Sequence, residues 1–118
     1  MTQHKGLDAD RWADFDIDQQ VLMIGNEMNR VSRFVDRDQG DAARLGYERV
    51  LRLTDLTVGG LPRPALLREL LRWRDVVAHL YCAQATDAAL HRSAFRALLL
   101  LTPTAAKQLP FLALTRSD

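Results

Sequence analysis

The chain has 118 residues, 47% of them hydrophobic, and its 16 basic and 15 acidic side chains give a formal net charge of +1. This length and balance suit one folded domain and argue against a disordered chain. The near-neutral total argues against wrapping long nucleic acid by bulk electrostatics. A local anion-binding patch stays open, because 14 of the 16 basic residues are arginines, whose guanidinium groups bind phosphate bidentately.

The polar first ten residues predict a flexible segment, 1–10, followed by one helical domain, 11–118. The N-terminus has no apolar signal core, and the longest apolar run, 97–101, is far too short to span a membrane. We therefore expect a cytoplasmic protein with no membrane partner. The single cysteine, Cys82, has no disulfide partner in the chain, and no Cys or His spacing resembles a zinc site. The sequence thus predicts no metal and no cofactor.

The first long helix is expected over 17–36. Asp16 is a favourable N-cap, and Gln19 follows three residues later, as a capping box requires. Apolar residues spaced three and four apart predict its buried seam. They are Ile17, Val21, Ile24, Met28, Val31 and Val35. Gly25 lies beside this seam at a cost in helix propensity, which indicates that another backbone passes close by.

The second and third helices are expected over 41–58 and 64–83. Gly59-Gly60 ends the second, and Pro64 suits the first position of the third, where its missing N–H is not needed. Each helix has an apolar stripe at helical spacing. These stripes are Ala43, Tyr47, Val50, Thr54 and Thr57 in the second, and Leu66, Leu70, Trp73, Val77 and Leu80 in the third.

A fourth helix is expected from a cap at Thr86 to about residue 101, ended by Thr102-Pro103. Its predicted inner face is Leu90, Ala94, Ala97, Leu98 and Leu101. A short helical turn should follow from Thr104 and stop at Pro110. No segment alternates as a strand would, and short connectors between long helices favour antiparallel neighbours. The predicted fold is all-α, an antiparallel bundle of four main helices with a short C-terminal helical turn.

The third predicted helix carries Arg74, Asp75, His79 and Tyr81 within eight residues. This pattern resembles the Arg-x4-His-x-Tyr motif of the HEPN superfamily of small helical-bundle proteins. Many of these are metal-independent ribonucleases, including toxins paired with nucleotidyltransferase antitoxins. The resemblance implies an RNA substrate attacked by its own 2′-OH, with His79 transferring protons and Arg74 clamping the phosphate. Asp75 would support them, and Tyr81 would be the residue that the antitoxin modifies.

The spacing of Arg74 and His79 adds a condition. Five residues correspond to about 140° around a regular helix, so the two side chains cannot face one phosphate from an unbroken helix. A working site needs either a distorted helix or a second subunit. HEPN proteins form dimers whose motifs meet in a cleft, so the resemblance predicts a homodimer through the third and fourth helices.

A second resemblance covers residues 11–81 and is to an uncharacterised bacterial family of short helical proteins, with no known activity to transfer. It rests on several short matches, of which Leu53-Thr54-Asp55-Leu56-Thr57 is the most recognisable. The others are Arg11-Trp12, Gln20, Ile24-Gly25-Asn26-Glu27, Arg30, residues 47–52 and residues 69–75.

Structural alternatives exist for each candidate residue. Arg74, beside Asp75 and near Glu69, suits a structural ion pair, His79 suits a plain surface position, and Tyr81 suits the core. Asp55, inside an apolar stretch, is expected to pair with an arginine. These structural roles lead to a second functional hypothesis, in which the chain is a non-catalytic helical interaction module with an apolar seam for a partner or a second copy.

Three further patterns in the sequence have weaker functional interpretations. Glu27 and Asp55 could be carboxylates of a bundle metal centre, but no helix supplies the Glu-x-x-His that such a centre uses. His91 and Cys82 have no companions in sequence and are predicted to be structural. Interleaved acidic residues make the arginines of the second and third helices, and of the connector between them, an ordinary solvated face rather than an anion-binding surface. They are Arg44, Arg49, Arg52, Arg63, Arg68, Arg72 and Arg74.

Overall fold

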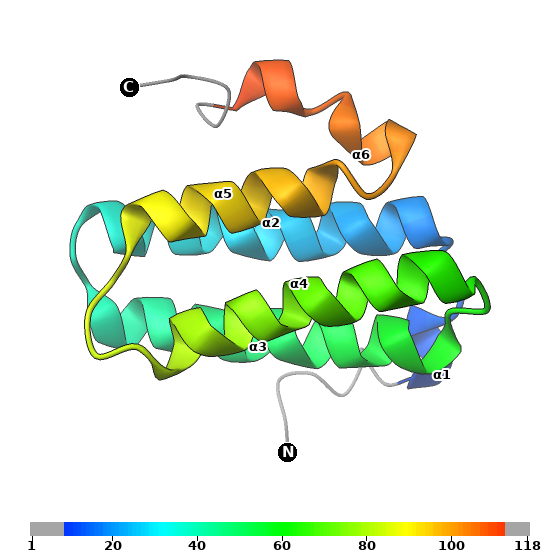
Figure 1. Cartoon of the computed structure of the whole chain (residues 1–118), viewed down its shortest axis with the longest axis horizontal. Helices are drawn as coiled ribbons and strands as arrows, with labels where there is room; N and C mark the ends of the chain where they lie inside the picture. Colours follow the sequence, from blue (N-terminus) through cyan, green and yellow to red (C-terminus); the bar gives the residue numbers. More distant parts are fainter. Residues whose placement is uncertain (1–8, 113–118) are drawn as a thin grey trace.

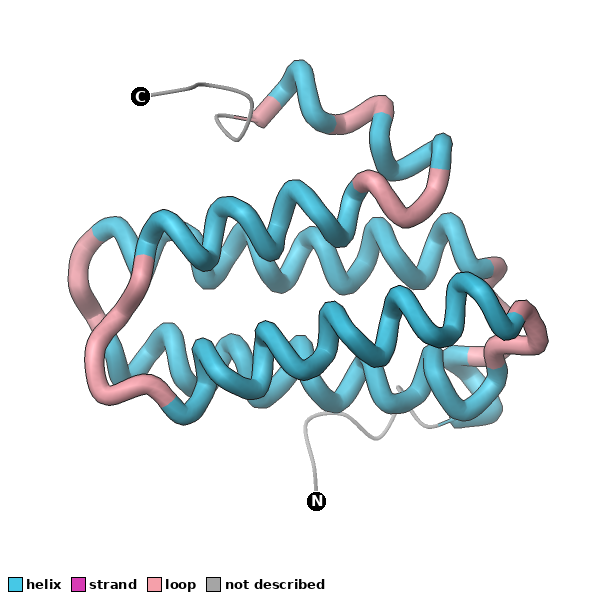
Figure 2. The backbone as a smooth tube through the Cα atoms, viewed as in Figure 1, coloured by secondary structure: helices cyan, strands magenta, loops and turns pink. Residues whose placement is uncertain are grey.

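The structure, a computed structural model, describes residues 9–112, and every regular element among them is helical (Figures 1 and 2). The elements are α1 (Ala9–Trp12), α2 (Ile17–Asp36), α3 (Gly40–Gly60), α4 (Pro64–Cys82), α5 (Ala88–Leu99), α6 (Pro103–Ala106) and the 3₁₀ turn η1 (Leu109–Phe111). The predicted all-α class is confirmed. Residues 1–8 of the segment predicted to be flexible, and residues 113–118 of the predicted domain, lie outside the described residues.

Local signals set most helix ends. The Asp16 side chain accepts from the Gln19 N–H at 2.8 Å, and the Gln19 side chain accepts from the Asp16 N–H at 2.9 Å, which completes the predicted capping box. Pro64 opens α4 as expected. The cap of α5 differs from the prediction by one residue: Asp87 accepts from the Leu90 N–H at 3.0 Å. Thr86 instead donates to Asp38 at 3.0 Å, which ties this loop to the end of α2.

The long helices pack so that α2 contacts α3 on one side and α5 on the other, and α3 contacts α4 (Figure 1). The predicted stripes of α2, α3 and α4 lie inside: Ile17 is half-buried, and all their other members are buried. Trp12, on the single turn of α1, is also buried. These side chains and the buried residues of α5 form one hydrophobic core.

The predicted inner face of α5 is wrong in part. Ala94 and Leu98 are buried as expected, but Ala97 is exposed, and Leu90 and Leu101 are only half-buried. The core side of α5 is completed by His91, Phe95 and Leu99 instead. The helix is therefore rotated about its axis relative to the prediction, toward α2 and away from α4.

Glycines in α2 and α3 mark where helices approach closely. A Cβ at Gly25 would lie 3.2 Å from Leu99 Cδ2 and 3.7 Å from Phe95 Cε1. Side chains of α5, rather than the predicted backbone, therefore occupy the space that this glycine leaves. Gly46 of α3 was not singled out from the sequence, yet a Cβ there would overlap the Val31 side chain of α2. Together these positions let α2 lie close to both of its neighbours.

None of the helices in residues 9–112 is both long enough and apolar enough to cross a membrane.

Candidate functional site

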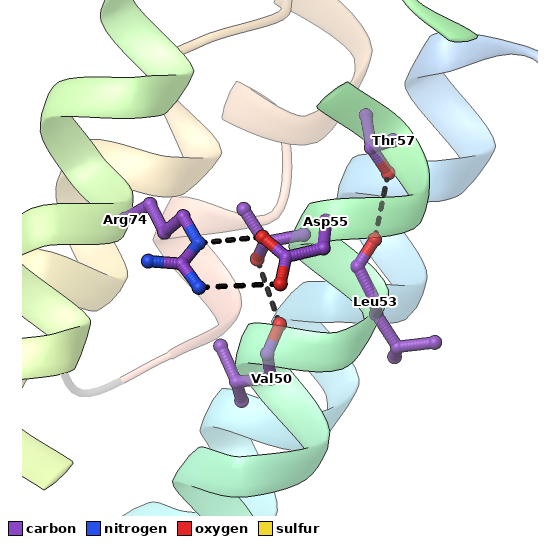
Figure 3. A network of polar contacts seen from close by, with 6 residues as sticks. Val50, Leu53, Asp55, Thr57 and Arg74 are labelled. Atoms are coloured by element: carbon purple, nitrogen blue, oxygen red, sulfur yellow. Dashed lines mark hydrogen bonds and ion pairs between the residues drawn. The ribbon is translucent and has the colours of Figure 1, made fainter. Parts of the chain in front are cut away.

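Arg74, the predicted phosphate clamp, lies on the side of α4 that faces α3. Its guanidinium binds Asp55 through two hydrogen bonds, Nε to Oδ1 at 2.5 Å and a terminal nitrogen to Oδ2 at 3.2 Å (Figure 3). The hydrogen bonds that Arg74 donates to Asp55, and the charges of Asp55 and Asp75, raise the pKa of Arg74, and burial opposes this rise. The prediction that Asp55 pairs with an arginine is confirmed, and this pair links α3 to α4.

The polar residues around Asp55 also have structural partners. Thr57 Oγ1 donates to the Leu53 carbonyl at 3.1 Å (Figure 3). The same oxygen accepts from the Trp12 indole N–H at 2.9 Å, and Thr54 donates to the Val50 carbonyl at 2.7 Å. Both threonines are buried. The stretch Leu53–Thr57 thus anchors α1 and α4 onto α3, which gives it a role in the fold.

His79 and Asp75 are exposed on α4, and neither side chain forms a hydrogen bond or ion pair with another residue in the range 9–112. The helix is unbroken from Pro64 to Cys82, so no distortion brings Arg74 and His79 to one point. Within one chain the two predicted catalytic residues therefore project from different sides of α4. A site that uses both needs residues from a second chain.

Tyr81, the predicted modification site, is half-buried and donates to Glu48 Oε2 of α3 at 3.0 Å. This hydrogen bond, with the charge of Glu48, raises the pKa of the Tyr81 hydroxyl. Arg44 donates to the carbonyl oxygen of Tyr81 at 3.3 Å. Tyr81 thus forms a second polar link between α3 and α4, about two turns from the Arg74–Asp55 pair.

An apolar groove, which we call the α4–α5 groove, lies on the other side of α4. Its volume is about 260 Å³, and α4 and α5 contact each other less than the other neighbouring long helices do. The Trp73 indole donates to the Ala94 carbonyl at 2.7 Å and bridges the two helices there. The lining is mostly small or apolar: Trp73, Val76, Leu90, Ser93, Ala94, Ala97 and Leu101, with Glu69 and Arg72.

Five of the residues that line this groove were predicted to lie in the core, and two of them, Trp73 and Ala94, are buried. Leu90, Ala97 and Leu101 are left at least partly exposed by the rotation of α5. The signal for this was present in the sequence, because α5 has apolar residues along more of its circumference than one core-facing stripe requires. The groove was not predicted from the sequence, because those residues were assigned to the interior.

A buried polar cluster joins α2, α3 and α5. His91 is 1% exposed, with Nε2 at 2.8 Å from Ser32 Oγ and Nδ1 at 2.8 Å from the Tyr47 hydroxyl. Ser32 donates its one hydroxyl proton to the Met28 carbonyl at 3.0 Å, so Nε2 carries the imidazole proton and Nδ1 accepts from Tyr47. His91 is structural, as predicted; the sequence did not show its partners, which lie 59 and 44 residues away.

Both ring nitrogens of His91 are hydrogen-bonded, and burial is the main cause of the shift in its pKa. Burial lowers the pKa of His91 to about 4, slightly offset by the Met28 carbonyl and the charge of Asp36. Burial also raises the pKa of the Tyr47 hydroxyl far above its usual range, with a smaller contribution from the charge of Asp87. Both groups are therefore neutral at pH 7.

The other candidate carboxylate is also paired. Glu27 accepts from Arg49 Nε at 3.0 Å, so the two carboxylates considered for a metal centre, Glu27 and Asp55, each bind an arginine. Across residues 9–112 there is no group of three or more His, Cys, Asp or Glu side chains that could hold a metal ion.

Comparison of the chain with protein-family models, with curated proteins and with solved structures finds no match. The resemblance to HEPN proteins accordingly rests on the motif from Arg74 to Tyr81 alone.

The Arg74–Asp55 pair gives a first testable prediction. Its bidentate geometry and partial burial place its coupling free energy at about 0.5–1 kcal/mol, the upper part of the range for accessible pairs. A double-mutant cycle of Arg74→Gln and Asp55→Asn, measured by urea unfolding, tests this. The exposed Arg72–Glu69 pair within α4 is the control and should give only about 0.3 kcal/mol. A coupling of zero for Arg74–Asp55 would show that Arg74 is free to bind another group.

Proposed function

We propose that this protein is a non-catalytic helical interaction module that binds an amphipathic helix of a partner in the α4–α5 groove. The scaffold in this proposal is an antiparallel bundle of four main helices, α2 to α5. The observation that carries this proposal is that α4 does not fully cover the apolar surface of α5, so apolar side chains of α5 remain partly exposed in a groove beside α4. An amphipathic helix that lays its apolar face into such a groove is a recurring mode of peptide recognition.

The state of the motif residues supports this function over catalysis. Arg74 and Tyr81 are engaged by α3, and His79 is exposed without a partner in the described part of the chain. A bound helix would cover the half-buried Val76, Leu90 and Leu101. Removing their exposed apolar surface from water would favour binding. The energetic driving force therefore lies in the groove and not at the motif.

Blocking the groove should abolish binding. The probe is a synthetic helical peptide of about five turns with leucines spaced three and four apart and polar residues elsewhere. Ala97→Glu puts a charge on the exposed wall of the groove without touching the core, and we expect it to weaken peptide binding at least tenfold by calorimetry, because a buried unpaired charge is costly.

The matched control for this experiment is Ala89→Glu. Ala89 is exposed on the same helix, has the same side chain and does not line the groove. It should leave peptide binding unchanged while adding the same charge to α5. Equal weakening by both variants, or no binding by the unaltered protein, would contradict the groove as the binding site.

A metal-independent ribonuclease is the second candidate function, and the exposure of His79 favours it, because its imidazole is open to a substrate. This candidate acts as a homodimer on RNA, with Arg74 of one chain meeting His79 of another and a nucleotidyltransferase-type antitoxin as partner. Its test is RNA cleavage without added metal by the protein and by the His79→Ala and Arg74→Ala variants, with the mass in solution measured on the same samples. Cleavage by a dimer, lost in both variants, would replace the interaction module.

A further inference from the structure

A second pocket, which we call the α1–α3 pocket, lies at the end of the bundle where the single turn of α1 packs against α3 (Figure 1). Its volume is about 540 Å³, against about 260 Å³ for the α4–α5 groove, and small-molecule sites typically have roughly 300–1,000 Å³. Its lining is mostly apolar and includes the half-buried side chains of Phe15, Ile17, Leu56 and Leu61. This pocket has the size and the lining of a site for a small apolar molecule.

The side-chain amide of Gln20 offers a ligand in this pocket an acceptor and no donor. Its nitrogen donates to the carbonyl oxygens of Trp12 and Phe15, both at 3.0 Å, and only the N–H groups of an amide can bind two carbonyls in this way. The Gln20 Oε1 atom accepts no hydrogen bond from the described residues. The Trp12 indole N–H, another donor in the lining, is already bound to Thr57.

The last turn of α3 adds further acceptors. Gly59 and Gly60 have no side chains, so the part of the lining that they form is backbone. Their carbonyl oxygens accept no hydrogen bond within residues 9–112, and Pro64, in the position to donate to Gly60, has no N–H. The carboxylate of Asp55 is 54% exposed, and each of its oxygens keeps one lone pair beyond the bond with Arg74. The pocket is therefore rich in acceptors.

The charge around the pocket also favours a cation. Residues 9–20 form one of its sides and contain four aspartates and one arginine. These aspartates do not line the pocket, but each is next in sequence to a residue that does, well within the roughly 10 Å over which charges interact at ordinary salt. Together with Asp55 they make five carboxylates, against Arg11, Arg63 and the Arg74 that binds Asp55. The C-terminal end of α3, a 21-residue helix, adds partial negative charge.

We propose that the α1–α3 pocket binds a small amine with an apolar body. The body would pack on the half-buried apolar side chains, and the ammonium group would donate to Gln20 Oε1 and to the carbonyl oxygens of Gly59 and Gly60. An ammonium near the half-buried Phe15 ring also gains a cation–π attraction. A carboxylate ligand, by contrast, would find Arg63 as the one cation of the described lining. This site is separate from the α4–α5 groove and does not depend on the function proposed for it.

Three probes that share a naphthalene ring test the proposal: naphthylmethylamine, naphthylmethanol and naphthoate. The chain has two tryptophans, Trp12 at this pocket and Trp73 at the α4–α5 groove, so their indole N–H signals in a proton–nitrogen NMR spectrum report on the two sites separately. We expect the amine to shift the Trp12 signal and leave the Trp73 signal unchanged. Its dissociation constant should be lower than those of the alcohol and the carboxylate by about tenfold, and salt should reduce this difference.

Two substitutions in the lining test the role of charge. Ala13→Arg puts a cation at an exposed position of the lining without removing a core side chain, and it should weaken amine binding about tenfold because like charges repel. The control is Ala89→Arg, which adds the same exposed charge on α5 outside the pocket and should leave binding unchanged. Arg63→Gln removes the cation of the described lining and should strengthen amine binding about threefold, as expected for one exposed charge.

Each other outcome overturns the proposal in a distinct way. Tighter binding of the carboxylate than of the amine, lost in Arg63→Gln, would show that Arg63 selects an anion. Equal affinity for the amine and the alcohol would show that the pocket does not select charge. If no probe shifts the Trp12 signal, or if the amine shifts only the Trp73 signal, the α1–α3 pocket is not a binding site. None of these results depends on whether the α4–α5 groove binds a helix, so the two proposals stand or fall separately.

Discussion

Acidification from pH 7 to pH 4 is expected to lower the free energy of unfolding by roughly 3 kcal/mol through His91 alone. The folded-state pKa of His91 is about 4, below its ordinary value of 6.5, because the ring is buried. Between these two values the unfolded chain binds a proton that the folded chain does not. The contribution of His91 to stability is therefore complete above about pH 6.5 and is lost progressively as the pH falls toward 4.

The hydrogen bonds of His91 explain why the protonated ring is not accommodated. Nε2–H already donates to Ser32, and Nδ1 accepts from Tyr47, so a second ring proton would be directed at the Tyr47 hydroxyl. That hydroxyl can turn its proton away, but its raised pKa keeps it from ionising to balance the new charge. A charged imidazole at this position would be buried without a counter-charge in contact with it.

Urea unfolding of the protein and of His91→Gln, repeated at intervals between pH 7 and pH 4, measures this contribution. His91→Gln should be less stable at pH 7, because it disrupts the contacts with Ser32 and Tyr47, but its stability should fall less steeply with acid. The same substitution at exposed His79 is the control and should reproduce the pH dependence of the unaltered protein. Parallel pH curves for His91→Gln and the unaltered protein would contradict the assignment.

Much of the fold was predictable because its signals are local. The capping box of Asp16 and Gln19, and Pro64 at the start of α4, act within one turn of the residues that carry them. The stripes of α2, α3 and α4 were predicted correctly because each of these helices buries one clear apolar face. Which arginine would meet Asp55 could not be predicted, since that depends on how far α4 slides along α3.

At the candidate site it is clearer what local sequence patterns can and cannot predict. Helix geometry alone predicted that Arg74 and His79 diverge, and the unbroken α4 places them on different sides. The α4–α5 groove and the cluster around His91 depend on the rotation of α5. The sequence shows that α5 is apolar around more of its circumference than one stripe requires, but it does not show which of its faces turns inward. Packing decides it: Phe95 and Leu99 occupy the space beside Gly25, so α5 turns toward α2 and leaves Leu90 and Leu101 at the groove.

Three consecutive leucines at the end of α5 test that rotation directly. Leu99 is 2% exposed and lies beside Gly25, Leu100 is 54% exposed, and Leu101 is half-buried at the groove. By urea unfolding, Leu99→Ala should cost about 3 kcal/mol because it leaves a cavity between α2 and α5, and Leu100→Ala should stay within about 0.5 kcal/mol. Leu101→Ala should cost about 1 kcal/mol, as only part of its side chain is removed from water.

The inner face predicted from the sequence requires the opposite order for Leu99 and Leu101. If Leu101→Ala proves the more costly, α5 faces α4, the groove is filled by its own helix, and the binding function proposed for it fails with it.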